Sequence, residues 1–265
     1  MNMNGKVALV TGSTSGIGRA TAVALAGRGA HVLVTGRNEE RGKQVLDTIL
    51  RTGGKADFLP ATLSGVDSAR ALARQAVDAG GGHVDILVNN TGFAVGGPTQ
   101  TATEAEFDET YAINVKVPFF LVAELAPPMA GRGWGAIVNI TTMVAGFGQP
   151  GMAVYGSSRA ALELLTKSWA AEFGPSGVRV NAVSPGPVRT PMSEAMGDMA
   201  DQMAALAPAG RVAAPGEIAD AIYSSDTLRS CGHLGSSAVV AVPGGGLVAA
   251  SQRDQCSWAA GAVGC

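Results

Sequence analysis

The fold is decided by residues 6–18, which read KVALVTGSTSGIG. The apolar run at the start of this stretch predicts a buried β-strand, and the alanine- and leucine-rich stretch Gly16–Arg28 predicts a helix. Between them, Gly12 permits a sharp turn, while Gly16 and Gly18 let the backbone approach a bound group closely. A helix that begins here offers unpaired N–H groups and a partial positive charge to an anion. We therefore expect a strand–turn–helix unit that binds the pyrophosphate of a dinucleotide.

The same alternation of short β-branched runs and longer helical patterns continues along the chain. Strands are expected at Lys6–Thr11, His31–Thr35, Ala56–Ala61, Val84–Val88, Gly135–Thr141, Val178–Val183 and Ala238–Val242. Helices are expected at Gly16–Arg28, Glu39–Arg51, Val66–Ala79, from about Thr103 to Glu124 with an interruption at Pro118, Met152–Phe173, Met192–Leu206 and Pro215–Ser224. This order predicts a single-domain α/β fold, a Rossmann-like doubly wound sheet of about seven parallel strands with helices on both faces. Residues 1–248 would form this domain, and residues 249–265 a loosely ordered tail.

Composition excludes several classes of protein. The 265 residues carry 19 basic and 21 acidic side chains, so no basic excess exists to neutralise a nucleic acid backbone. The three histidines are isolated from one another and from the three cysteines, which all lie near the C-terminus, so neither a metal site nor a disulfide framework is expected. We find no signal peptide and no long apolar run, and we expect a cytoplasmic protein with no membrane span.

The residues after the second expected strand indicate the type of dinucleotide. They read Thr35-Gly36-Arg37-Asn38, with no carboxylate until Glu39. An acidic side chain at this place would bind the ribose 2′-hydroxyl of NAD, whereas Arg37 can pair with a 2′-phosphate through a charge-assisted, forked contact. The sequence therefore favours NADP(H) over NAD(H). The alternative interpretation is that Arg37 is a solvated surface arginine with no contact to the cofactor.

Several motifs in a fixed order make the chain resemble the short-chain dehydrogenase/reductase family from about Lys6 to Val248. These are the T-G-x-x-x-G-I-G turn at Thr11–Gly18, Asn89-Asn90-Thr91-Gly92, Asn114, the strand Gly135–Thr142, Tyr155 in a Y-x-x-x-[basic] motif, and Ser184-Pro185-Gly186. The resemblance implies a hydride transfer between NADP(H) and a carbonyl carbon, with Tyr155 as general acid/base. It implies a catalytic set of Tyr155, Thr142, Asn114 and Arg159. It also implies a cofactor site made of Gly12, Thr14, Ser15, Gly16, Ile17, Gly18, Arg37, Leu63, Asn90, Gly92, Tyr155, Arg159, Pro185, Gly186, Val188 and Thr190.

Two catalytic positions depart from the family pattern. Thr142 stands where the family has serine, and it keeps a hydroxyl that can hold a carbonyl oxygen. Arg159 stands where the family has lysine, four residues after Tyr155 and on the same helix face. Arginine keeps the positive charge beside the phenol. Because it does not deprotonate, a proton relay through residue 159 is not expected, and because it is larger and planar, the contact that the family's lysine makes with the nicotinamide ribose must be rebuilt around a fork. Thr62, in place of the family's aspartate near the adenine, and Pro243, before the closing glycines, are further departures.

The residues around the expected site predict a small hydrophobic carbonyl or alcohol substrate. The segment Met143–Met152 carries no charge, and Met192, Met196, Met199 and Met203 recur at helical spacing as one stripe, which could line the substrate or simply pack on the body. The resemblance also implies a homodimer or homotetramer. Two alternatives stay open: a dinucleotide-binding protein with little redox turnover, and a non-redox enzyme on the same scaffold.

Overall fold

The structure, a computed structural model, describes residues 2–194, 197, 199–205, 210–223 and 239–241. The strands are β1 (Val7–Val10), β2 (His31–Gly36), β3 (Lys55–Pro60), β4 (Ile86–Asn89), β5 (Gly135–Ile140), β6 (Val178–Ser184) and β7 (Val239–Ala241). The helices are α1 (Gly16–Ala26), α2 (Glu39–Arg51), α3 (Val66–Ala79), α4 (Glu104–Tyr111), α5 (Val117–Gly131), α6 (Ala153–Phe173), α7 (Pro191–Glu194), α8 (Met199–Ala205) and α9 (Pro215–Tyr223). The expected tail and the expected domain end at Val248 lie outside the described residues.

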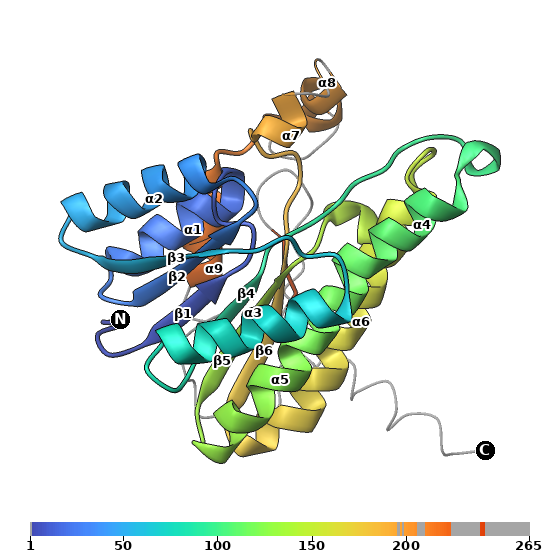
Figure 1. The fold of residues 1–265 in the computed structure, drawn as a ribbon. Helices are drawn as coiled ribbons and strands as arrows, with labels where there is room; N and C mark the ends of the chain where they lie inside the picture. The colour runs from blue at the N-terminus through green and yellow to red at the C-terminus, as the bar shows by residue number, and fades with distance from the viewer. Residues whose placement is uncertain (1, 195–196, 198, 206–209, 224–238, 242–265) are drawn as a thin grey trace, which may run out of the picture.

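The described strands form one parallel sheet of seven, in the order β3-β2-β1-β4-β5-β6-β7 (Figure 1). The chain first builds from β1 towards β3, and then continues from β4 on the other side of β1. Strand order therefore reverses between β1 and β4, and ligands of open α/β sheets bind outside the carboxyl ends of the strands at such a point. The predicted doubly wound α/β class is confirmed.

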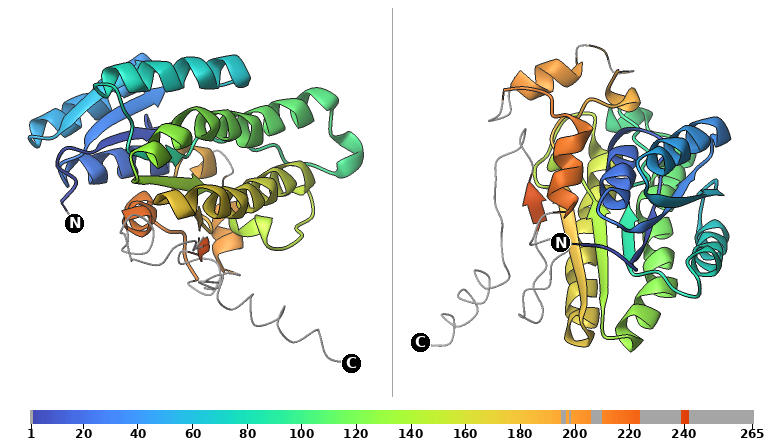
Figure 2. Two further views of the ribbon diagram at one scale, coloured as in Figure 1. Left: turned by 90° about the horizontal axis from the view of Figure 1, so that it is seen from below. Right: turned by 90° about the vertical axis from the view of Figure 1, so that its left-hand side faces the viewer.

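Helices cover both faces of the sheet, as the two views of Figure 2 show. Residues of β1 alternate between two buried apolar clusters, as the period of a strand requires. Ala8 and Val10 join one cluster with side chains of α1, α2 and α9. Val7 and Leu9 join the other with side chains of α3, α5 and α6. The parallel sheet is thus buried on both faces, so a ligand would bind at the ends of the strands and not on a face of the sheet.

The long helical segment from α4 to α5 differs from the expectation at Pro118. The proline does not interrupt the helix; it lies in the first turn of α5, where an N–H group is not needed. The irregularity is a π-helical turn at Ala112–Lys116, just before the proline, in which the Val117 N–H bonds to the Ala112 carbonyl. A π turn inserts an extra residue into the helix and is frequent at functional sites.

The single helix expected at Met192–Leu206 is wrong. The structure has two short helices, α7 and α8, and between them Gly197 adopts a φ of 57°, in the left-handed region that ends helices. The continuous helix that the predicted methionine stripe requires is therefore interrupted at Gly197. Met196 and Leu206 lie outside the described residues.

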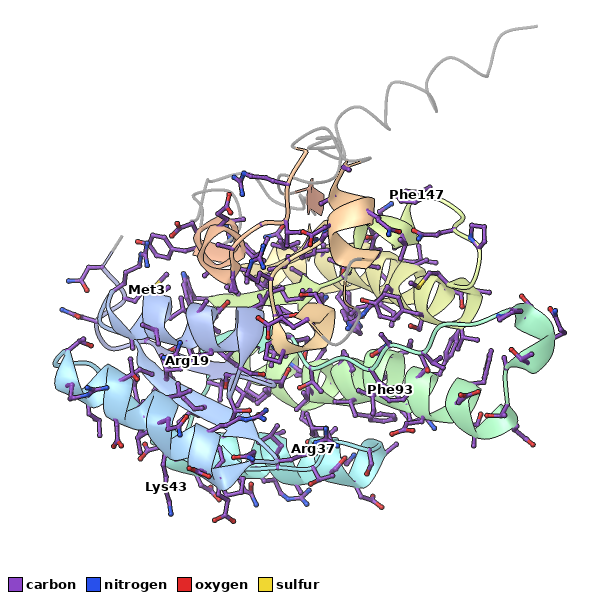
Figure 3. The ribbon with its side chains drawn as sticks, turned by 90° about the horizontal axis from the view of Figure 1, so that it is seen from above. Met3, Arg19, Arg37, Lys43, Phe93 and Phe147 are labelled. Atoms are coloured by element: carbon purple, nitrogen blue, oxygen red, sulfur yellow. The ribbon has the colours of Figure 1, made fainter. Side chains whose placement is uncertain are left out.

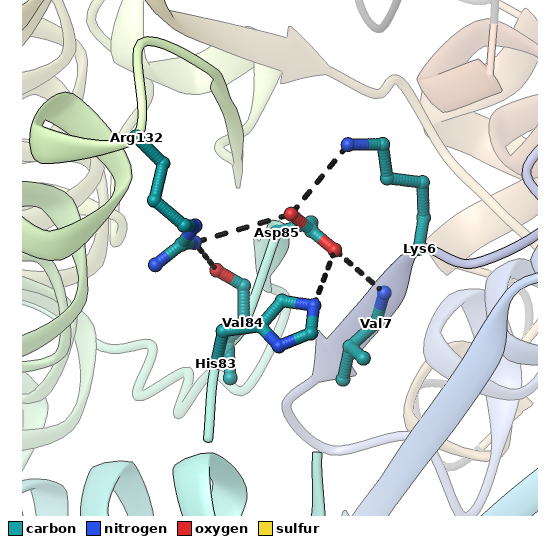
Figure 4. A network of polar contacts seen from close by, with 6 residues as sticks. All are labelled: Lys6, Val7, His83, Val84, Asp85 and Arg132. Atoms are coloured by element: carbon teal, nitrogen blue, oxygen red, sulfur yellow. Dashed lines mark hydrogen bonds and ion pairs between the residues drawn. The ribbon is translucent and has the colours of Figure 1, made fainter. Parts of the chain in front are cut away.

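A polar cluster joins the amino ends of the central strands, at the edge opposite the carboxyl ends (Figure 4). Asp85 accepts a hydrogen bond from the Val7 N–H at 3.0 Å, and its oxygens lie 3.6 Å from Lys6 Nζ, 3.3 Å from His83 Nε2 and 3.9 Å from an Arg132 nitrogen. A buried carboxylate is stable only when it is paired and hydrogen-bonded, as it is here. This cluster fixes β1 beside β4.

Within the described residues, the helical stretch Glu104–Gly131 is long and apolar enough to cross a membrane by length and composition alone, with a mean hydropathy of 1.2. However, 44% of its most apolar window is buried inside the protein. The core helix of a soluble protein passes the same test, so this single stretch is weak evidence for a membrane span.

Candidate active site

The glycine turn after β1 has the geometry of a pyrophosphate site. Gly12 and Gly16 have φ values of 62° and 53°. A β-carbon on Gly18 would collide with the Gly12 carbonyl oxygen and with the Asn90 side chain. Ser15 precedes α1 without a hydrogen bond from its side chain to the first turn, so that turn is not capped by its own N-cap residue. The turn therefore presents backbone N–H groups at the start of a helix to an anion.

Asn90 braces this turn from the end of β4. Its side-chain Nδ2 donates to the carbonyl oxygens of Thr11, at 2.9 Å, and Gly12, at 3.1 Å. In return, Thr11 Oγ1 accepts from the N–H groups of Asn90 and Thr91, at 2.9 and 3.0 Å. These reciprocal bonds hold the carboxyl ends of β1 and β4 together at the point where strand order reverses. Asn90 thus shapes the turn, and a direct contact of its side chain with the cofactor stays a prediction.

The segment after β6 closes over the same turn. Pro185 and Val188 are buried, and Gly186 and Thr190 are half-buried. A β-carbon built on Gly16 would lie 3.1 Å from Thr190 Cγ2, so Thr190 lies directly against the glycine turn. The point between β1 and β4, where strand order reverses, is called the switch point below. The cofactor residues predicted in the turn after β1 and those predicted after β6 are therefore neighbours in space.

The end of β2 leaves no room for an acidic side chain at Gly36. A β-carbon there would lie 2.5 Å from Thr14 Cγ2 and 2.8 Å from Thr14 Oγ1. The next residue, Arg37, is exposed, and Figure 3 labels it in the lower part of the view. Ser13, which the sequence analysis did not single out, fixes this corner because its Oγ accepts from the Thr35 N–H at 2.8 Å. Leu63 lies buried near β3.

Asn114 is fully buried in the π turn and links the helices to the loop after β4. Its Oδ1 accepts from the Phe93 N–H and its Nδ2 donates to the Phe93 carbonyl, both at 2.8 Å. Nδ2 also donates to Ser158 Oγ at 3.0 Å, and that hydroxyl donates to the Tyr155 carbonyl at 2.7 Å. The structure therefore brings Asn114 to the helical turn that carries Tyr155. In a regular helix the Asn114 carbonyl would accept from residue 118, which is a proline with no N–H.

Arg159 is 4% exposed and is held beside Tyr155. Its Nη1 donates to the Ile140 carbonyl at 3.0 Å, and its Cζ lies 5.5 Å from the centroid of the Tyr155 ring. Its Nη2 occupies the place where a β-carbon of residue 92 would stand, so any side chain at residue 92 would displace the guanidinium. Its Nε is buried and has no hydrogen-bond partner within the part of the chain that the structure describes.

That unpartnered Nε tests whether the site suits a nicotinamide dinucleotide. A buried charged N–H group without a partner is costly, and a hydroxyl of the cofactor's ribose is the kind of acceptor that would satisfy it. Together with the glycine turn and the Gly16–Thr190 contact, this donor makes the residues present fit such a cofactor. When bound, the nicotinamide would supply or accept a hydride, and the surrounding residues would orient it and handle the proton.

Thr142 follows β5 and is half-buried. The next residue anchors the segment, because the Met143 N–H donates to the Pro185 carbonyl at 3.0 Å. Phe93 is half-buried and Phe147 is 50% exposed, and Figure 3 shows both on the side of the molecule that carries α4 and α6. The Gly97 N–H donates to the Gly151 carbonyl at 2.9 Å, which ties the loops after β4 and β5 together.

A carboxyl group that the sequence analysis missed lies behind these residues. Glu163 Oε1 accepts from Thr141 Oγ1 at 2.9 Å, and its side chain also bonds to Ser184. Burial raises the pKa of this carboxyl, and the bonds from Thr141 and Ser184 and the charge of Lys167 oppose that rise. Its position four residues after Arg159 and eight after Tyr155, on one helix face, is the signal that could have found it.

The comparisons with known proteins agree with this geometry. The family model described as short chain dehydrogenase matches residues 6–201, well over half of the chain. The chain belongs to the short-chain dehydrogenase family. It is therefore an oxidoreductase of a family that binds NAD(P).

Individual members give the range of chemistry found in this family. A cyclopentanol dehydrogenase from Comamonas sp. (strain NCIMB 9872) is 36% identical over 223 residues, which cover 83% of this chain and 89% of that protein. A 7α-hydroxysteroid dehydrogenase complexed with NADH and 7-oxo glycochenodeoxycholic acid has a TM-score of 0.85 and 32% identity, and the match covers 93% of this chain and 96% of that one. A blue fluorescent protein from a metagenomic library, in complex with NADPH, has a TM-score of 0.84 and 30% identity over 92% of this chain and 99% of that one. Relatives of this short-chain dehydrogenase thus act on alcohols and ketones and use either dinucleotide.

Proposed function

We propose that this short-chain dehydrogenase interconverts a hydrophobic ketone and a secondary alcohol with NADP(H), with Tyr155 as the general acid and base. The observation that carries the proposal is the buried Arg159 guanidinium, 5.5 Å from the Tyr155 ring centroid and with an unpartnered Nε, at the carboxyl end of the sheet. In the reducing direction, the Tyr155 hydroxyl would donate its proton to the oxygen of the substrate as the alkoxide forms. Thr142 would hold that oxygen through its hydroxyl.

Arg159 and Asn114 would support Tyr155 in different ways. Arg159 carries a permanent positive charge beside the phenol, which stabilises negative charge on the phenol oxygen after the proton leaves. Because arginine does not deprotonate, it would act as a fixed charge and a donor to the ribose, and not as a link in a proton relay. Asn114 holds Phe93 and Ser158 and so fixes the position of the helix that carries Tyr155.

The preference for NADP(H) is supported by the corner between β2 and α1. Position 36 cannot carry the carboxylate that binds an NAD ribose unless Thr14 moves. The adjacent Arg37 is exposed, so its guanidinium is available to bind a 2′-phosphate.

A hydrophobic, neutral substrate is supported by the loops beside Tyr155. Phe93 and Val95 follow β4, and the segment from Met143 to Met152 has no charged residue. Such a lining disfavours charged substrates because it would desolvate them without compensation.

An assay of NADPH oxidation with a panel of hydrophobic ketones tests the proposal. The wild-type enzyme should turn over, and Tyr155→Phe should lose at least about 100-fold in kcat while it still binds NADPH, because only the proton donor is removed. The variant Arg159→Lys shows whether the arginine limits the rate. Tight NADPH binding without turnover in either the wild type or Arg159→Lys would instead support a dinucleotide-binding protein, the alternative that the unusual arginine motivates.

We also propose that the chain assembles through the surface made by α4, α5 and α6. This surface exposes three large apolar side chains, Phe107, Phe119 and Leu164, at 46%, 41% and 66%. Apolar side chains that gather on neighbouring helices indicate an interface, and a homodimer or homotetramer would bury them.

A further inference from the structure

Helix α6 is joined to the end of β5 by hydrogen bonds at three successive residues, the last two of the strand and the one that follows it. Asn139 Nδ2 donates to Thr166 Oγ1 at 2.8 Å, the Ile140 carbonyl accepts from Arg159, and Thr141 donates to Glu163. Arg159 and Glu163 are one helical turn apart, so these two charged side chains contact the strand from adjacent turns. The helix that carries Tyr155 is thus bonded to the strand that leads into Thr142.

Glu163 differs from its neighbours because it bonds to two strands at once. Its carboxyl accepts from Thr141, the residue after β5, at 2.9 Å, and it also bonds to Ser184, the last residue of β6. Thr141 in turn lies against β6, since its N–H donates to the Val183 carbonyl at 2.8 Å. One carboxyl therefore connects α6, β5 and β6 just before the two loops of the site begin.

Partial burial of the Glu163 carboxyl costs desolvation free energy, which indicates that its hydrogen bonds have a structural role. The side chain is half-buried, Thr141 and Ser184 are 3% and 6% exposed, and burial disfavours the charged form of the carboxyl. An apolar residue would avoid that cost but would leave the two hydroxyls without this acceptor. Lys167, one turn further along α6, is the charged group that interacts with it.

We propose that Glu163 is a positioning residue, which holds the ends of β5 and β6 against α6 so that Thr142 and the segment from Pro185 to Thr190 keep their places beside Tyr155. The inference rests on the proposed function, because those two segments are the ones assigned to the substrate oxygen and the nicotinamide. Thr142 directly follows the bonded Thr141, and Pro185 directly follows the bonded Ser184. A small shift of either segment would spoil the geometry of hydride transfer, since misplacement of about 1 Å can cost about 100-fold in rate.

This arrangement predicts which kinetic constant changes. The glycine turn and Arg37, to which we assign the two phosphate contacts of the cofactor, belong to β1, α1 and β2, whereas the partners of Glu163 belong to β5 and β6. Glu163→Leu should therefore lower kcat by about tenfold or more, while the Kd for NADPH, measured by fluorescence, changes by less than about threefold. Glu163→Gln should recover most of kcat, because its amide oxygen accepts from Thr141 and its NH₂ donates to Ser184. The matched control is Glu172→Leu, which removes an exposed carboxyl from the same helix and should leave both constants unchanged.

The outcomes separate this inference from the proposed function. If the wild type is active, three results would overturn the positioning role alone. These are a kcat of Glu163→Leu equal to that of the wild type, a kcat of Glu163→Gln no higher than that of Glu163→Leu, and losses of similar size in kcat and NADPH binding in Glu163→Leu. If Glu163→Leu does not fold, Thr141→Val removes the same bond from the strand side, and a wild-type kcat in that variant overturns the inference. A wild type without turnover would overturn the proposed function and this inference with it.

Discussion

A single buried arginine determines much of the local structure of the site. The Arg159 guanidinium fits because residue 92 is glycine, because the Ile140 carbonyl accepts one N–H group, and because the Tyr155 ring lies alongside. A buried cation needs such partners, since its desolvation is otherwise prohibitive. The Nε N–H is buried and has no hydrogen-bond partner among the described residues. Under the proposed function, Arg159 would take the place of the family's lysine as a fixed, forked donor.

Arg37 should set the preference between the two dinucleotides. Arg37→Ala should weaken NADPH binding by about 10- to 100-fold, the value of a lost charge-assisted contact, and should leave NADH binding unchanged. Fluorescence titration with each dinucleotide measures both constants. Lys43→Ala, which removes an exposed cation from α2 (Figure 3), is the control and should change neither. Equal losses for NADPH and NADH in Arg37→Ala would contradict a 2′-phosphate contact.

Glu163 should make stability depend on pH in a defined direction. Burial raises the pKa of its carboxyl above the ordinary value of 4.5, so the folded protein holds this proton more tightly than the unfolded chain. The corresponding stability is fully present below pH 4.5 and is lost as the pH rises through the raised pKa. Glu163→Gln removes this loss, so its free energy of unfolding should rise relative to wild type as the pH increases above 4.5. Urea denaturation across this range measures it, and parallel curves would exclude the effect.

At the level of elements, the turn between β1 and α1 depends on close approach of backbone to backbone. Gly18→Ala should abolish NADPH binding or weaken it by at least about tenfold, because the new methyl group would displace the Gly12 carbonyl and the Asn90 side chain. Gly131→Ala at the end of α5, where a β-carbon meets no atom of the described residues within 4 Å, is the control. It should leave binding unchanged and raise stability by about 0.5–1 kcal/mol. Calorimetric titration measures the Kd for NADPH of both variants. A wild-type Kd in Gly18→Ala would contradict the assignment of the turn as the pyrophosphate site.

The elements that the sequence predicted well are those with a strong local signal. The strand–turn–helix at residues 6–28 and the helices Glu39–Arg51 and Val66–Ala79 follow from apolar periodicity and glycine placement. The π turn before Pro118 was not predicted, because periodicity does not reveal one extra residue in a helix. The break at Gly197 was read as helix, because the methionine spacing outweighed a single glycine. Glu163 was missed since its partners, Thr141 and Ser184, come from distant strands.

At the scale of the whole molecule, the sheet places the two halves of the site on either side of the β1–β4 switch point. The residues assigned to the adenosine half of the cofactor lie with β1, α1 and β2, and those assigned to catalysis lie with β5, β6, α5 and α6. The apolar surface on α4, α5 and α6 lies on the catalytic half. Assembly through this surface would therefore brace the helices that carry Asn114 and Tyr155.

Leu164 is the most exposed large apolar side chain of that surface, at 66%. Leu164→Glu should shift the protein to a smaller species, because a charge inside an apolar interface would be desolvated without a partner. Sedimentation velocity measures the change. Leu50→Glu, at an apolar position 49% exposed on α2, is the matched control and should leave the assembly intact. A wild-type assembly in Leu164→Glu would place the interface elsewhere.

The most direct test of the central claim is to follow the transferred hydrogen. NADPH that carries deuterium at the reactive carbon of its nicotinamide is supplied with a hydrophobic ketone, and the alcohol product is examined by mass spectrometry. The account predicts deuterium on the carbinol carbon with the wild-type enzyme, and almost no labelled alcohol with Tyr155→Phe, although this variant still binds NADPH. Labelled alcohol at the wild-type rate from Tyr155→Phe, or no labelled alcohol from a wild type that binds NADPH, would contradict it.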